Sequence, residues 1–314
     1  MSRALSTLLA LVLSGSVLAW LLAEVDLAVV AAALHDASLP RLALIPPLVG
    51  LIQVLRAWRF ELMAFPGSRG PSPRMVRISV HLIALNFALP FKLGELSFPL
   101  LMKHAFAVPY ARSTGILLLA RLFDLGAVLA ILLAMGALLL PVGTPLWASA
   151  LLLLAAVAAA LAPPVLATLA PWLRGWALSP HRPILDHLLA GAASLETMPR
   201  RLQALALTLA TWAAHGAVGW LATSAIAPEV ALPAAILAAA AANVAFALPV
   251  PTIAGLGPPQ AAWVGAMTFA GVAFETAVLA ALLSHVMLLG TIASLWLGVW
   301  LWGVWRPADA AIRG

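Results

Sequence analysis

Four charged residues stand in stretches of the sequence that are otherwise apolar: Lys92, Glu95, Arg121 and Asp124. A charge at the centre of a lipid-embedded helix costs at least about 2.5 kcal/mol, so such residues are candidates for function. Arg121 and Asp124 are three residues apart and therefore share one helix face. Arg121 and Lys92 can hold a phosphate, and Glu95 can pair with a cation or take up a proton. Alternatively, Arg121–Asp124 and Lys92–Glu95 form two pairs that serve only the fold.

Two of these charges lie in a break in the hydrophobic pattern at residues 85–99. Asn86 is polar there, and Pro90 and Gly94 are poor helix residues. Irregular backbone at membrane depth is tolerated only beside protein or a water-filled cavity. The break is therefore expected to face a cavity, with Asn86 among the residues that line it.

A second break at residues 243–260 has a similar order of residues. Its candidate binding residues are Asn243, Gly255, Gly257 and Gln260. The two glycines allow close backbone approach, and Gln260 can donate and accept hydrogen bonds. His285 follows Gln260 by 25 residues, much as Arg121 follows Glu95 by 26. His285 is either a packed, hydrogen-bonded residue or a participant in the site.

Composition places these residues in a membrane protein. The 314 residues are 64% hydrophobic and 9% charged, with a mean hydropathy of +1.07, whereas about 25% charged residues is usual in soluble domains. Apolar runs of about 20 residues span a bilayer. The sequence predicts an all-α polytopic membrane protein, a single domain over residues 1–314. Its six expected full spans are 4–23 (a retained helix), 42–63, 113–140, 146–169, 202–226 and 276–302.

The positions of the basic residues predict the topology. Of the 17 Lys and Arg residues, 14 are placed in the cytoplasm, with Arg41 outside and Lys92 and Arg121 in the membrane. Basic residues concentrate on the cytoplasmic side of membrane proteins, so both termini are expected there. The same clustering in loops favours a membrane protein over a nucleic-acid-binding one. Basic flanks surround the first break and acidic ones the second. We therefore expect two broken re-entrant hairpins that enter from opposite faces.

The order of spans and breaks also predicts an internal repeat. One unit covers residues 42–140 and the other residues 202–303, each with a span, a broken hairpin and a span. The first unit begins outside and the second inside, so the two would be inverted relative to each other. Inverted repeats with discontinuous helices are typical of transporters.

The sequence lacks the motifs that mark disulfides, metal sites and several classes of enzyme. The chain has no cysteine, which excludes disulfides and thiolate metal sites. It has no HExxH, GxSxG, Gly-rich phosphate loop or Asp-rich cluster. We therefore expect no metal, no cofactor and no enzymatic activity.

Taken together, the motifs resemble a known family. The residues that carry the resemblance are Asn86, Pro90, Gly94 and Glu95, then Arg121 to Asp124, then Leu248, Pro249, Gly255 and Gly257. In this order they resemble the lysylphosphatidylglycerol synthase transmembrane, or flippase-like, family over roughly residues 5–303. The resemblance implies a protein of the bacterial inner membrane that moves lipids between leaflets. We expect a stand-alone member without the soluble synthetase domain. The family often has Glu where this chain has Gln260, which puts a lysyl-lipid substrate in doubt.

These observations predict a lipid flippase or transporter for a phosphate-bearing lipid of the aminoacyl-phospholipid, hopanoid or glycolipid type. The predicted groove holds the phosphate with Arg121 and Lys92, while Glu95 and Gln260 complete its polar lining. Two alternatives stay open. One is a membrane enzyme that acts on a lipid-linked substrate with Glu95 as general base. The other is a non-catalytic partner of a lipid-biosynthesis enzyme.

Overall fold

The computed structural model describes residues 35–65, 67–139, 197–248 and 254–305, together with isolated positions elsewhere. Within these ranges every regular element is helical. The helices are α3 (Leu39–Ala43), α4 (Ile45–Ala64), α5 (Pro73–Ala88), the 3-10 helix η1 (Pro90–Leu96), α6 (Ser97–Phe106), α7 (Tyr110–Leu139), α10 (Met198–Ile226), α11 (Leu232–Ala247), α12 (Pro258–Phe269) and α13 (Phe274–Trp305).

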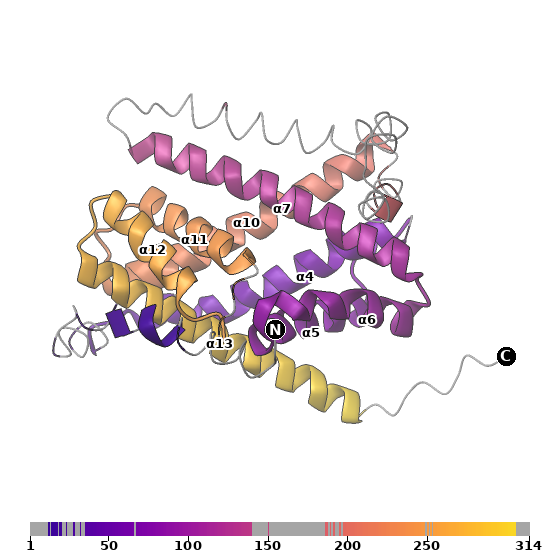
Figure 1. Cartoon of the computed structure of the whole chain (residues 1–314), viewed down its shortest axis with the longest axis horizontal. Coiled ribbons are helices and arrows are strands. Elements are labelled where there is room, and N and C mark those ends of the chain that lie inside the picture. The colour runs from indigo at the N-terminus through magenta and orange to yellow at the C-terminus, as the bar shows by residue number, and fades with distance from the viewer. Residues whose placement is uncertain are drawn as a thin grey trace.

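Four of the described helical segments are long and apolar enough to cross a membrane: Leu39–Ala64, Tyr110–Leu139, Met198–Ile226 and Phe274–Trp302. They confirm the second, third, fifth and sixth spans expected from the sequence. The other two expected spans, 4–23 and 146–169, lie outside the described residues apart from a few isolated positions. Figure 1 shows α7 and α13 on different sides of the molecule, with α4 and α10 between them.

Two of the short helices between these spans, α5 and α11, end just before the prolines that mark the breaks. Ser72 caps the start of α5, where its hydroxyl accepts a hydrogen bond from the Met75 amide at 3.2 Å. Leu89 and Leu248 follow α5 and α11 in extended conformation, and each precedes a proline. A proline disfavours helical dihedral angles in the residue before it. Within the first break the chain forms η1, and α6 begins directly after it.

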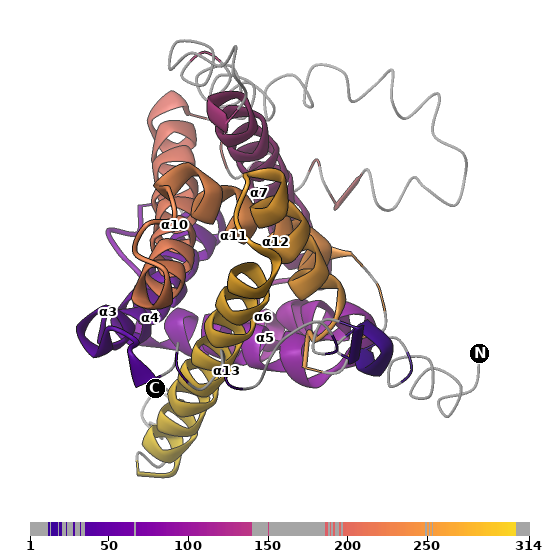
Figure 2. The same ribbon diagram turned by 90° about the vertical axis from the view of Figure 1, so that its left-hand side faces the viewer.

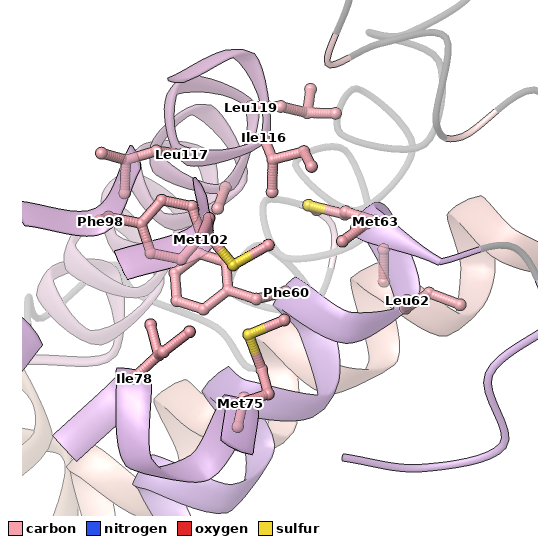
Figure 3. Close-up of a cluster of buried hydrophobic side chains, with 14 of the residues drawn as sticks. Phe60, Leu62, Met63, Met75, Ile78, Phe98, Met102, Ile116, Leu117 and Leu119 are labelled. Carbon is pink, nitrogen blue, oxygen red and sulfur yellow. The ribbon is translucent and has the colours of Figure 1, made fainter. Parts of the chain in front are cut away.

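One end of the molecule is built around a buried cluster that joins α4, α5, α6, α7 and α10. Phe60 and Phe98 lie with ring centroids 4.5 Å apart, and Met75 and Met102 belong to the same cluster (Figure 3). Because Met75 is near the start of α5 and Met102 is in α6, the chain leaves this end in α5 and returns to it in α6. Arg112 and Arg200 at this end donate hydrogen bonds to the last carbonyl groups of α4. The C-terminal end of a helix carries a partial negative charge and therefore attracts such cations.

The other end has its own buried cluster, formed by α10, α11, α12 and α13. Ala234 near the start of α11 and Met267 near the end of α12 both belong to it, so the chain leaves this end in α11 and returns in α12. Helix α7 joins the two ends, since Ile116 is in the first cluster and Leu139 packs on the second. The view in Figure 2 shows α13 in front of α5, against which it packs.

Candidate functional site

The most buried charge in the described residues belongs to Arg59, whose side chain is 1% exposed. Its two terminal nitrogens donate to the two carboxylate oxygens of Asp124 at 2.7 and 2.9 Å, and Nη1 also donates to the Thr208 hydroxyl at 2.8 Å. Such a bidentate pair is among the strongest hydrogen-bonding arrangements in proteins. It joins three membrane-spanning helices, α4, α7 and α10, through their interior.

Arg121 continues this network toward the first break. Its Nη2 lies 2.8 Å from Glu95 Oε1, and Nε donates to Oε2 at 3.2 Å. Nη1 contacts Asp124 at 3.4 Å. The Arg121 and Glu95 side chains are 37% and 26% exposed, so this outer pair is far more open than the Arg59–Asp124 pair. The structure therefore brings together Glu95, Arg121 and Asp124, three of the residues singled out in the sequence.

Lys92 does not form the ion pair with Glu95 that the sequence suggested as an alternative. None of the ion pairs found in the described part of the chain joins Lys92 to Glu95. Instead, Lys92 Nζ lies 2.8 Å from the centroid of the Phe246 ring, over its face. A cation over an aromatic face is attracted by the ring quadrupole. Lys92 thus connects the first break to α11, and its backbone has a positive φ of 58°.

A cavity of about 870 Å³, its open side included, lies beside this network. It is lined by α4, α5, α10, α11, α12 and α13 and by Gly255 in the second break. Four of the predicted site residues border it: Asn243, Gly255, Gln260 and His285. Arg56 also lines the cavity and is close enough to Arg59, Arg121, Asp124 and Glu95 to interact electrostatically with all of them.

Several of the predicted residues, including two that border the cavity, also have structural contacts. Asn86 is buried against Gly94, where a Cβ would collide with the Asn86 backbone. The side chain of Asn243 donates to the Ala239 carbonyl at 2.8 Å. Gly257 begins α12 with a φ of 103°, and its amide donates to Gln260 Oε1 at 2.7 Å. The side-chain oxygen of Gln260 therefore caps the helix, while its NH2 group is not used in this contact.

The structure also identifies site residues that the sequence prediction missed. Arg56 and Arg59 were expected on the cytoplasmic side, whereas both are buried inside the helix bundle. Gln53, Arg56 and Arg59 recur every three residues within an apolar stretch. Residues with this spacing lie on one face of a helix, so the sequence did contain a signal for a polar face on this span. Trp212 is a further member, because its indole nitrogen donates to Asp124 at 3.3 Å.

A metal-dependent site receives no support from the described residues, which contain no group of three or more His, Cys, Asp or Glu able to hold a metal ion. The charged groups of the site are instead three arginines beside two carboxylates, Glu95 and Asp124. Such an arrangement can bind and orient a charged head group.

Fold and site together define a multi-pass helical membrane protein with a buried ionic network and an internal cavity. The chain belongs to the family described as "Lysylphosphatidylglycerol synthase TM region", which matches residues 7–296. This family is membrane-associated and related to lipids. No match was found among curated proteins or among solved structures.

Proposed function

We propose that this protein transports a phosphate-bearing lipid across the membrane, with the head group passing through the cavity and the acyl chains staying in the bilayer. The observation that carries the proposal is the Arg121–Glu95 pair. It joins a membrane-spanning helix to a break between two short helices, next to a cavity of about 870 Å³. Family membership supports a lipid as the substrate.

The proposal includes two re-entrant hairpins that enter from opposite faces of the bacterial inner membrane. In its support, α5 and α6 both return to one buried cluster and α11 and α12 to the other. A transporter needs a polar path that is closed to one side at a time, and discontinuous helices near the bilayer centre are a common way to build one. On this proposal the Arg112 and Arg200 end, with both chain termini, is cytoplasmic.

The proposed inverted repeat is supported by the order and length of the helices. α5 and α11 each have 16 residues, and each ends within the same four-residue sequence, Phe-Ala-Leu-Pro, at 87–90 and 246–249. Helices of 30 and 32 residues, α7 and α13, close the two units. On this proposal the cavity lies between the units, since α4 and α5 line it together with α10 to α13.

Glu95→Gln tests the function directly. Glutamine has nearly the shape of glutamate, and its side-chain oxygen can still accept a hydrogen bond from Arg121, so the change removes the charge and keeps the contact. The variant should therefore fold like the wild type and lose transport. Transport is measured in proteoliposomes as the movement of fluorescent phosphatidylglycerol to the inner leaflet, where dithionite does not bleach it.

Glu229→Gln is the matched control, because Glu229 is an exposed glutamate away from the network. Transport at the wild-type rate in Glu95→Gln would contradict the proposed function. A new lipid species formed by the pure protein would point instead to an enzyme.

A further inference from the structure

Arg56 is a buried cation that lacks a carboxylate partner. The residue is 7% exposed and lines the cavity. None of the ion pairs found in the described part of the chain includes it. The one hydrogen bond seen for its guanidinium among these residues is a long one, 3.5 Å to Gln53 Oε1. Burying a charge without a partner is costly, so this side chain has unused capacity to bind an anion.

The surrounding carboxylates are not available to bind Arg56. Three arginines, Arg56, Arg59 and Arg121, interact with two carboxylates, Glu95 and Asp124. This leaves a formal excess of one positive charge. Both carboxylates are already engaged by Arg59 and Arg121 at 2.7–2.8 Å. An additional anion is therefore needed to balance the site, and it would meet Arg56 from the cavity side.

A second residue that lines the same cavity carries a polar atom without a partner. Trp263 Nε1 is buried and has no hydrogen-bond partner among the described residues. The indole N–H can only donate, so it needs an acceptor. The orphaned donor on α12 and the guanidinium on α4 thus call for the same kind of ligand, one that offers several acceptor oxygens. Phosphate has this property and matches the fork of an arginine.

The rest of the lining indicates what kind of molecule would carry such a phosphate. Most other residues that border the cavity are apolar, including Ile52, Ile83, Val218 and Leu288. Such a wall favours a hydrocarbon over a fully solvated ion. We propose that the cavity binds the phosphate of an amphiphile, with Arg56 as its principal ligand and Trp263 as a second donor. This inference rests on the proposed function and assigns the phosphate to Arg56, whereas the sequence predicted Arg121 and Lys92.

The inference is tested by calorimetric titration of the purified full chain in dodecyl maltoside with dodecyl phosphate. Arg56→Gln should weaken binding about 10- to 100-fold, because a charge-assisted hydrogen bond is lost. Trp263→Phe keeps the ring and removes one donor, so it should weaken binding about two- to tenfold. Arg74→Gln removes an exposed arginine and should bind like the wild type. Equal affinity of the wild type and Arg56→Gln would overturn the inference.

Two additional titrations identify the ligand class. Inorganic phosphate should bind much more weakly than dodecyl phosphate, and dodecyltrimethylammonium should not compete. If inorganic phosphate binds as tightly, the cavity holds a free anion and the amphiphile is excluded. If Arg56→Gln does not fold, Arg56→Lys and Trp263→Phe provide the comparison: Arg56→Lys keeps the charge but not the fork. Wild-type affinity in both would overturn the inference.

The outcome is separable from that of the proposed function. Arg56-dependent binding of dodecyl phosphate without lipid movement in proteoliposomes would refute transport and keep the binding site. Lipid movement that depends on Glu95 but not on Arg56 would refute the binding site and keep transport.

Discussion

Phe87 and Phe246 stack on each other with ring centroids 4.6 Å apart and an angle of 26° between the rings. Each is the first residue of a Phe-Ala-Leu-Pro sequence, one at the end of α5 and the other at the end of α11. Gly255 lies against both rings, and a Cβ there would come within 2.8 Å of Phe246. The two breaks are therefore joined by matching aromatic residues.

This pair should be energetically coupled. Stacked aromatic pairs contribute about 0.5–1.5 kcal/mol beyond the area they bury. Phe87→Leu and Phe246→Leu should each destabilise the protein, and the double variant should lose less than the sum of the two by about that amount. The free energy of unfolding is measured by denaturant titration in mixed micelles. Strict additivity would show that the rings do not act as a pair.

The Arg59–Asp124 pair should behave as a single unit. Removal of one partner from a buried ion pair costs about 3–5 kcal/mol, because the other charge is left alone. Arg59→Met or Asp124→Leu should each cause a loss of this size. The double variant Arg59→Met/Asp124→Leu should be more stable than either single variant in the same unfolding measurement. A double variant less stable than both would contradict this view.

Gly94 should tolerate no side chain. A Cβ at this position would meet the backbone of Asn86 and Leu85, which cannot move without shifting α5. Gly94→Ala should therefore lower the midpoint of thermal unfolding. The control is Gly126→Ala in α7, where nothing lies within 4 Å of the added Cβ. That change should be neutral or stabilise by up to about 1 kcal/mol, because alanine favours helix. Equal midpoints for the two variants would disprove the clash.

Gln260 should be needed as a helix cap and replaceable by glutamate. Gln260→Ala removes the acceptor of the Gly257 amide and should cost about 1 kcal/mol. Gln260→Glu keeps an acceptor oxygen in place and faces the same cavity as Arg56, so it should be more stable than Gln260→Ala. Thermal unfolding of the two variants against the wild type checks the order. The reverse order would exclude the capping role.

The spans and breaks could be predicted because their signals are local. About 20 apolar residues specify a span, and Pro90 and Pro249 stop a helix wherever it lies. Glu95 and Arg121 were recognised as candidates because an intramembrane charge is conspicuous in an apolar sequence. The full spans at residues 4–23 and 146–169, together with the substrate-binding roles of the site residues, stay predictions.

The partners of these residues could not be predicted, because they come from distant helices. Arg59 is near the end of an apolar span and was counted with the basic residues of the cytoplasmic side, because its partner Asp124 lies 65 positions further along. Lys92 turns toward Phe246 rather than toward Glu95, and this choice depends on the backbone path through η1. Aromatic residues such as Phe87 and Phe246 do not stand out in an apolar sequence as charged residues do, so their contact can be recognised only in the folded structure.

The two ion pairs of the site have different mechanical consequences. Separating Arg59 from Asp124 would leave charges bare in the protein interior, at several kcal/mol, so α4 and α7 form a rigid frame. The Arg121 and Glu95 side chains are 37% and 26% exposed, so their separation leaves the charges less deeply buried and costs less. Glu95 therefore makes the weaker ionic contact of the site: the connection between the first break and α7 can open while Arg59 and Asp124 keep α4 and α7 together.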